Sequence, residues 1–135
     1  MNCIKELTLK LAEANYQGHR FNCLPIEGEQ PVLRVEVSEL DDLPIFVTAS
    51  ETQLLCIVYL FKDSEVAEGR HDELNQYLLE LNVPMPLSSF AKIDEYYVVF
   101  GSMATDSTLE NVMLELVTLA QNANSALPAL EEFIS

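Results

Sequence analysis

The sequence feature that most constrains the fold is an uninterrupted run of eight apolar residues from Leu54 to Phe61. The run is far shorter than the ~20 apolar residues that a membrane-spanning helix needs, and its length is typical of a buried strand. A strand that is apolar on both faces lies inside a sheet and is covered on both sides. We therefore expect residues 53–61 to form a central strand that is covered on both of its faces.

Two further strands are expected just before this one. In residues 32–37, Leu33, Val35 and Val37 share one face, while Arg34 and Glu36 lie on the other, as in a strand with one solvated face. Residues 45–49 form a second apolar segment, and the short connections predict that the three strands make an antiparallel meander. Residues 19–31 are instead expected to be a connecting loop, because they contain two prolines and a glycine.

Apolar residues at helical spacing predict helices before and after this meander. The first helix spans residues 3–16 and is terminated by Gly18. The second spans residues 70–82, and the prolines that follow it cannot continue a helix. Residues 90–93 and 96–100 then read as two strands joined by a short turn and ended by a glycine.

The last helix has the clearest sequence signals. Ser107 and Glu110 have the spacing of a capping box at the start of a helix. An apolar face continues from Leu109 to Ala123, and Pro128 is expected to end or kink the helix.

Together these elements predict one α+β domain over residues 1–135. The expected order is α-β-β-β-α-β-β-α, with a twisted antiparallel five-stranded sheet packed by helices. A length of 135 residues is that of a single ordinary domain.

The charge of the chain excludes several classes of function. Acidic residues outnumber basic ones 22 to 7, which gives a formal net charge of -15. Such a surface repels nucleic-acid phosphates and anionic lipids, while a hydrophobic content of 49% excludes a disordered acidic tail. Lys92 is the last basic residue, so residues 93–135 carry seven acidic residues without a compensating cation. A partner that binds this part of the chain would be basic.

We predict no catalytic residues, no cofactor and no metal site. The two histidines, His19 and His71, lie far apart, and neither zinc-ligand spacing nor a glycine-rich phosphate loop occurs. Cys23 and His19 could approach each other in the expected loop as nucleophile and base, but a purely structural role is favoured for both. The three cysteines, with no apolar export signal before them, predict reduced thiols in a cytoplasmic protein.

Two features favour binding of another protein. The segment from Val83 to Leu87 displays apolar side chains on a backbone stiffened by prolines, and methionine adapts to varied contact surfaces. The alternative is that Met85 and Leu87 fold back onto the core. The second feature is the net charge of -15, which raises the rate of association with basic partners. The alternative is that this charge serves solubility alone. The predicted partner surface consists of Pro84, Met85, Pro86, Leu87, Glu110 and Glu115.

The sequence also resembles a known family. Residues 81–90, residues 97–101 and the helix from Leu109 through Asn122 are similar to the YjfI-like family of bacterial proteins of unknown function. The order of the elements resembles that of class I type III secretion chaperones and the related YbjN-like proteins. That resemblance implies a small, acidic, cytoplasmic and dimeric protein that binds other polypeptides rather than catalysing a reaction.

Two main hypotheses about function follow. The first is a non-catalytic, chaperone-like or adaptor protein that binds another protein and forms a homodimer, which would cover exposed strand edges or an apolar face. The second is a small-molecule sensor or small enzyme with a pocket between the sheet and the last helix. A third is a regulatory subunit whose acidic C-terminal third engages a basic helical protein at a membrane surface.

Overall fold

The computed structural model describes residues 3–135, apart from the side chain of Cys3. It has an α+β fold, as predicted. In chain order the elements are α1 (Cys3–Ala12), β1 (Asn15–Tyr16), β2 (His19–Ile26), β3 (Val32–Val37), β4 (Ile45–Ala49), β5 (Gln53–Lys62), α2 (His71–Leu81), β6 (Ser89–Ile93), β7 (Tyr96–Ala104) and α3 (Leu109–Leu130), with short 3-10 helices at Asp63–Glu65 and Glu131–Phe133.

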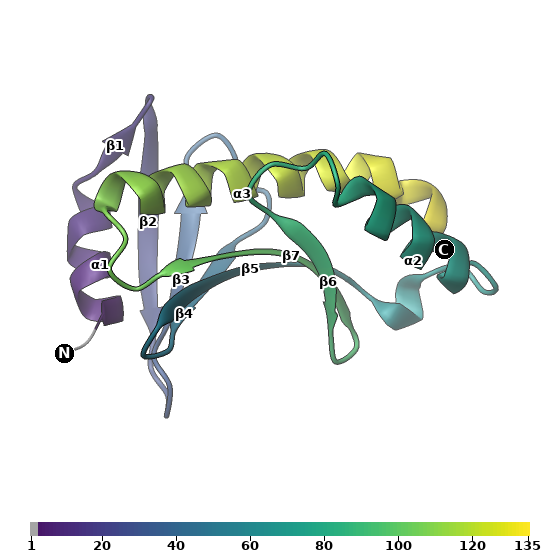
Figure 1. Cartoon of the computed structure of the whole chain (residues 1–135), viewed down its shortest axis with the longest axis horizontal. Coiled ribbons are helices and arrows are strands. Elements are labelled where there is room, and N and C mark those ends of the chain that lie inside the picture. Colours follow the sequence, from purple (N-terminus) through teal and green to yellow (C-terminus); the bar gives the residue numbers. More distant parts are fainter. Residues whose placement is uncertain (1–2) are drawn as a thin grey trace.

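The strands form one antiparallel sheet in the order β1-β2-β3-β4-β5-β7-β6 (Figure 1). The predicted meander is confirmed by the ladders that join β3, β4 and β5. The prediction of five strands was wrong, because the segment expected to be a loop forms β2 and the expected end of the first helix forms β1. Pro25 fits within β2 because this strand lies near the edge of the sheet, where a residue without an N–H is tolerated.

The first helix is shorter than predicted. It ends at Ala12, because Asn15 and Tyr16 pair with β2 across a two-residue turn. Gln17 and Gly18 occupy that turn with φ of 51° and 88°, which is the backbone that a tight antiparallel hairpin requires.

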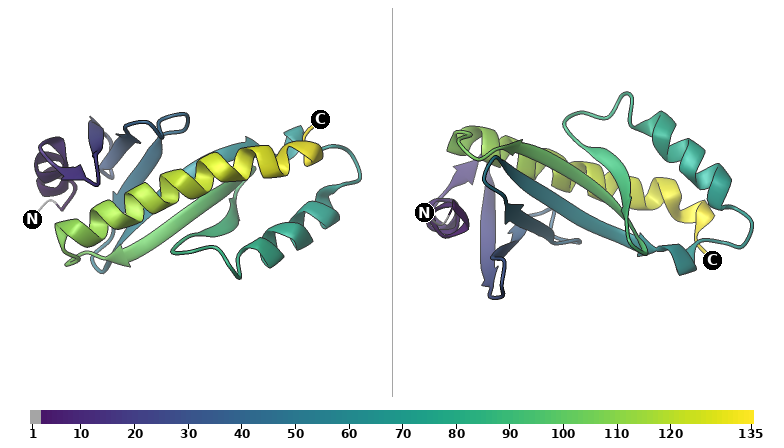
Figure 2. Two further views of the ribbon diagram at one scale, coloured as in Figure 1. Left: turned by 90° about the horizontal axis from the view of Figure 1, so that it is seen from above. Right: turned by 60° about the horizontal axis from the view of Figure 1, so that its bottom comes forward.

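One face of the sheet carries the hydrophobic core. The long helix α3 lies across this face, and α1 lies at the end of the same side, beside β2 (Figures 1 and 2). The core fills the space between these helices and the sheet. Its fully buried side chains include Leu11, Leu33, Val35, Val47, Leu54, Val58, Leu116, Leu119 and Leu130.

The opposite face of the sheet has no helix over it among the described residues (Figure 1). β5 lies inside the sheet between β4 and β7, as predicted. Its second face, however, is not covered by another layer, so the prediction of cover on both sides was wrong. The apolar side chains on both faces of β5 correctly predicted an internal strand. They did not predict that the helices of the described residues all lie away from the second face.

The start of α3 is capped by Thr108, not by Ser107. The Thr108 hydroxyl accepts a hydrogen bond from the Asn111 N–H at 3.2 Å. Ser107 instead donates to the Ala104 carbonyl at 2.7 Å. We expect Thr108→Ala to lower the free energy of unfolding by about 1 kcal/mol, because an N-cap oxygen is lost. Urea titration followed by circular dichroism measures this change, and an equal effect of Ser107→Ala would contradict the assignment of the cap.

Two sequence signals for the ends of elements were overridden by packing. The helix continues past Pro128 to Leu130, because Ala126, Leu130 and the following Phe133 are all buried and hold the last turn against the core. Strand β7 continues through Gly101 to Ala104. A Cβ atom at Gly101 would lie 2.7 Å from Oε2 of Glu115 and 3.3 Å from the Leu87 carbonyl oxygen, so the glycine marks a close approach rather than a turn, and a larger residue would have to displace the Glu115 carboxyl group.

Candidate functional site

The face of the sheet that α3 leaves uncovered, called the open face below, is the candidate functional site. The register of the ladders decides which residues share it, because paired residues project to the same side. Its apolar members are Leu24, Ile26, Val32, Phe46, Leu55, Ile57, Tyr59, Ala91, Ile93, Tyr96, Val98 and Phe100.

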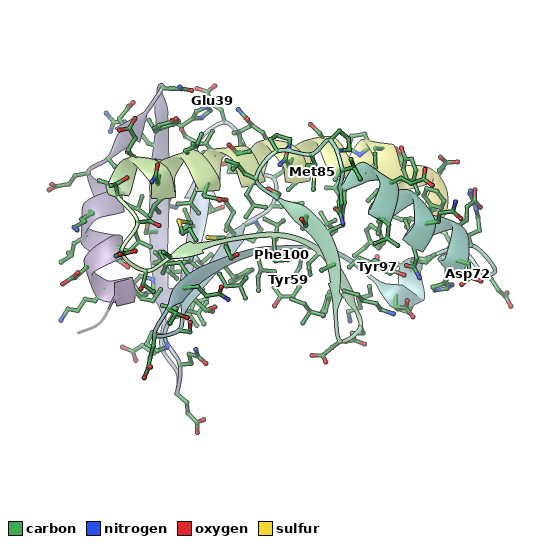
Figure 3. The ribbon with its side chains drawn as sticks, viewed as in Figure 1. Glu39, Tyr59, Asp72, Met85, Tyr97 and Phe100 are labelled. Carbon is green, nitrogen blue, oxygen red and sulfur yellow. The ribbon has the colours of Figure 1, made fainter. Side chains whose placement is uncertain are left out.

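Aromatic rings dominate the middle of the open face. Tyr59 packs edge-to-face against Phe46 with ring centroids 5.8 Å apart, and against Tyr96 at 5.2 Å. Tyr59 and Phe100 point away from α3 (Figure 3). Val98 has an exposure of 0% although it lies outside the main core cluster. The rings therefore form a packed apolar cluster of their own, and their outer surfaces stay half-exposed.

The open face differs in charge from the rest of the protein. Its strand residues include the basic Arg20, Arg34 and Lys62, and the acidic Glu36. Lys62 Nζ lies 5.6 Å from the centre of the Tyr96 ring, in cation–π contact. The Nε atom of Arg34 is buried and has no hydrogen-bond partner among the described residues. A buried donor without an acceptor is costly.

The proline-rich segment predicted to be a partner surface lies on the other side of the molecule, against α3. Asn122 of α3 donates hydrogen bonds to the Pro86 carbonyl and the Ser88 hydroxyl, both at 3.0 Å. Met85 is half-buried and packs against the core, while Leu87 is 50% exposed. The segment thus combines both alternatives. Met85 folds back onto the core, and Pro84, Pro86 and Leu87 remain exposed.

The two acidic residues predicted for the same surface lie in different environments. Glu110 is exposed in the first turn of α3. Glu115 lies one and a half turns later and faces the sheet above Gly101, with its Oε2 atom buried and without a partner among the described residues. The structure therefore does not bring Glu115 together with Glu110 on one surface. The other acidic residues of 93–135 lie at the β6–β7 turn and at the two ends of α3.

The position of Glu115 has a consequence for pH dependence. Burial raises the pKa of its carboxyl group, so the folded state binds the proton more tightly than the unfolded state. This contribution to stability is present at low pH and is lost as the pH rises through the raised pKa. We expect Glu115→Gln to stabilise the protein at pH 7, by less than about 1 kcal/mol because the group is partly solvated.

The measurement is urea unfolding of both proteins at pH 4 and pH 7. The advantage of Glu115→Gln should shrink toward pH 4. The matched variant Glu110→Gln, at an exposed position of the same helix, should show no such pH-dependent advantage. A constant difference between wild type and Glu115→Gln across this range would contradict the buried position of the carboxyl group.

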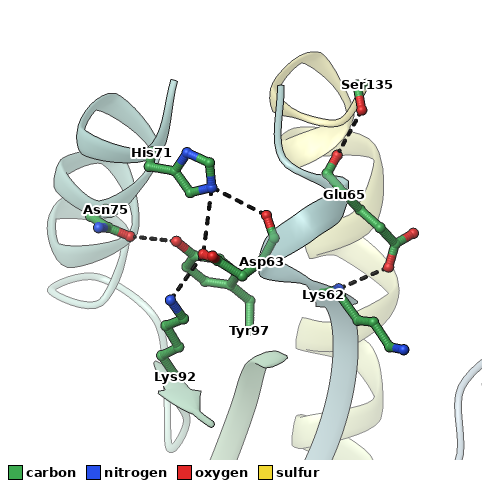
Figure 4. A network of polar contacts seen from close by, with 8 residues as sticks. All are labelled: Lys62, Asp63, Glu65, His71, Asn75, Lys92, Tyr97 and Ser135. Carbon is green, nitrogen blue, oxygen red and sulfur yellow. Dashed lines mark hydrogen bonds and ion pairs between the residues drawn. The ribbon is translucent and has the colours of Figure 1, made fainter. Parts of the chain in front are cut away.

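A polar network joins α2 to the sheet beyond the end of β5 (Figure 4). Lys92 Nζ donates to Asp63 Oδ1 at 2.9 Å, and this hydrogen bond, the largest influence, lowers the pKa of Asp63. His71 Nε2 lies 3.1 Å from the Asp63 carbonyl oxygen, and the Tyr97 hydroxyl donates to Asn75 at 2.9 Å. These contacts fix α2 beside the sheet, and each polar group already has an internal partner.

The cysteines and histidines form no reactive pair in the described part of the chain. His19 and Cys23 both lie on the extended strand β2, about 13 Å apart at the usual rise per residue, so the loop in which they were expected to approach each other does not exist. Burial raises the pKa of Cys23 to about 11 and that of Cys56 to about 12, so both remain thiols at neutral pH.

Two features are absent from residues 3–135. No group of three or more histidine, cysteine, aspartate or glutamate side chains is placed to hold a metal ion. None of the described helices is long and apolar enough to cross a membrane. A cavity of about 620 Å³ lies between α1 and the β2–β3 connection. A smaller cavity of about 280 Å³ lies where α3 meets β6 and the proline-rich segment, with Phe90, Asn122 and Ala126 in its lining. This smaller cavity is the one that lies between the sheet and the last helix, where the second hypothesis from the sequence placed a ligand pocket.

Residues 2–134 match the family described as "Uncharacterized protein conserved in bacteria (DUF2170)". The chain belongs to this family. The chain is similar in sequence to the uncharacterized protein YjfI of Escherichia coli strain K12. The two are 28% identical over 114 residues, which cover 82% of this chain and 84% of the relative. YjfI of Escherichia coli O157:H7 matches to the same extent.

Among solved structures, the fold of this DUF2170 protein is similar to that of a chain in the crystal structure of the ExsC–ExsE complex. The TM-score is 0.47 and the sequence identity is 13%, over 95% of this chain and 96% of that chain. The match to DUF2170 agrees with the resemblance to the YjfI-like family seen in the sequence.

Proposed function

We propose that this DUF2170 protein is a non-catalytic, chaperone-like protein-binding module, and that the open face is the surface that binds its partner. The observation that carries the proposal is the aromatic cluster of Phe46, Tyr59 and Tyr96 on a sheet face without a helix over it. Contiguous apolar surface on a soluble protein marks interaction sites, and aromatic residues are enriched where binding energy is concentrated.

The charges on the open face indicate the chemistry of the partner. Arg20, Arg34 and Lys62 lie among its strand residues, although the whole chain carries a net charge of -15. A polypeptide segment with apolar side chains and a carboxylate supplies both the apolar contact and a charge that pairs with these basic side chains. A second copy of the chain is less suitable, because it presents the same basic residues and a net charge of -15.

The acidic residues of 93–135 support a second candidate, a basic partner that binds at the exposed start of α3, where Glu110 lies. Binding of this kind weakens strongly between low and physiological salt, whereas binding at an apolar face does not. We also infer a cytoplasmic setting for the protein, which the free thiols of Cys23 and Cys56 support.

The experiment compares two variants that each introduce one glutamate. The partner that co-purifies with the wild-type protein is identified, and its affinity is then measured by calorimetry. We expect Tyr59→Glu to weaken binding by roughly 30-fold or more, because a central aromatic contact is replaced by a carboxylate that repels the partner's acid. The matched control is Leu114→Glu on α3, where Leu114 is 39% exposed and α3 lies on the other face of the sheet, and it should change the affinity less than twofold.

Equal binding by the wild type and Tyr59→Glu would contradict the proposal. Sedimentation provides the other decisive result. A stable homodimer that Tyr59→Glu dissociates would assign the open face to a second copy, as the sequence-based homodimer hypothesis holds, and would also contradict a heterologous partner there.

A further inference from the structure

At one edge of the sheet, a side chain forms hydrogen bonds with the outward-facing main-chain groups of the edge strand. β6 pairs with β7 and with no other described strand. The Asn82 amide, just after α2, accepts a hydrogen bond from the Phe90 N–H at 2.7 Å and donates to the Phe90 carbonyl at 3.4 Å. A carboxamide carries the same donor and acceptor as a peptide group. Asn82 therefore takes the place that a peptide group of a neighbouring strand would occupy.

The edge continues beyond this contact. Because outward-pointing groups alternate along an antiparallel strand, the N–H and carbonyl of Lys92 point to the same side as those of Phe90. A cavity of about 250 Å³ lies against this edge, with Leu78 and Leu79 of α2 on one wall and Phe90 and Ala91 of β6 on the other. Leu79 is 70% exposed. Main-chain hydrogen-bonding groups and an apolar wall thus lie side by side.

We propose that this edge binds an extended peptide segment, which pairs with β6 as an additional strand and displaces the Asn82 side chain. The inference rests on the proposed function in that it takes the partner to be a polypeptide, and it specifies the conformation of the bound segment. Alternate side chains of an added strand enter the cavity beside α2, and the others extend the open face beyond Ala91. The segment therefore has apolar residues at every second position.

A second copy of the chain fits this edge less well than a peptide does. Pairing two β6 edges brings together two proteins that each carry a net charge of -15. It also displaces two Asn82 amides instead of one. A peptide enters alone between α2 and β6 and displaces one amide.

The test uses a synthetic peptide of sequence TVEVTVE with blocked ends, and a twin with N-methyl groups on the alternate peptide nitrogens that face β6. Both have the same side chains, but the twin cannot pair as a strand. We expect the first peptide to bind the wild type and to slow hydrogen exchange at the Lys92 amide, and the twin not to bind. Asn82→Ala should bind the first peptide about tenfold more tightly, because no amide has to be displaced.

A second variant keeps the test valid if Asn82→Ala fails to fold. Asn82→Asp accepts the Phe90 N–H in a stronger, charge-assisted hydrogen bond and repels the glutamates of the peptide, so its affinity should fall below that of wild type. Tyr59→Glu separates this inference from the proposed function, because Tyr59 lies two strands away and the variant should bind the peptide within threefold of wild type.

Several results would overturn the inference. These are equal binding of the N-methylated twin, unchanged exchange at Lys92 in the presence of peptide, no binding by any variant, and dimerisation of Asn82→Ala in sedimentation experiments. The last result would assign the edge to a second copy. If Tyr59→Glu abolishes partner binding while the peptide results fail, the proposed function stands and only the edge site is wrong.

Discussion

Replacing Phe133 with alanine should lower the free energy of unfolding by about 3–5 kcal/mol, although this residue is the third from the end of the chain. Phe133 is 3% exposed. Its ring lies 5.6 Å from that of Tyr77 in α2, and the Arg70 guanidinium lies 4.5 Å above it. The variant leaves a cavity where these elements meet and removes the cation–π contact.

Main-chain hydrogen bonds around Phe133 explain why loss of its ring would also weaken the contacts of neighbouring elements. Its carbonyl accepts a hydrogen bond from the Ala67 N–H at 2.7 Å, and Val66 and Ile134 form an isolated β-bridge. Arg70 also donates to the Glu132 carbonyl at 2.9 Å. The end of the chain therefore fastens α2 and the segment before it to α3. Without the ring, the contacts that position α2 beside the sheet are weakened together.

Urea unfolding measures this effect, with Glu131→Ala as the matched control. Glu131 is exposed in the same 3-10 helix, and its replacement should change stability by less than about 0.5 kcal/mol. Since folded domains are stable by about 5–15 kcal/mol, Phe133→Ala is expected to show a large fall in the urea midpoint. Similar midpoints for the two variants would mean that the C-terminal residues do not fasten α2.

The strands and helices with strong periodicity could be predicted from the sequence, and those that depend on distant contacts could not. β3 and β4 have the predicted bounds, and α2 differs by one residue at each end. β2 was missed because Pro25 and Gly28 are turn residues in a local reading, whereas pairing with β3 decides the structure. Gly101 was taken as a terminator because the close approach of Glu115 is invisible in the local sequence.

The candidate site was largely missed for a related reason. The apolar character of β5 on both faces was evident, but the sequence does not state which face the helices cover. The half-buried position of Glu115, in contrast, could have been predicted from the sequence. It lies three residues after Val112 and four before Leu119, on the apolar stripe of α3, where a side chain faces the sheet. Its carboxyl group was instead interpreted as surface charge.

Replacing Val98 with aspartate should destabilise the protein by more than about 4 kcal/mol, because it places an unpaired carboxylate in a buried position. Val98 lies on the open face, where it pairs with Tyr59 of β5 and Ala91 of β6. Its exposure is 0% without a helix above it, since neighbouring side chains of the same face enclose it. The open face is therefore already packed in the free protein.

Ser102→Asp is the matched control, because Ser102 is exposed on the same strand and the same face, four residues further along. It should change the urea midpoint little. Equal midpoints for Val98→Asp and Ser102→Asp would mean that water reaches the whole face and that no aromatic cluster exists there. A large difference supports a preformed surface, and a preformed surface binds a partner without the entropic cost of ordering its side chains first.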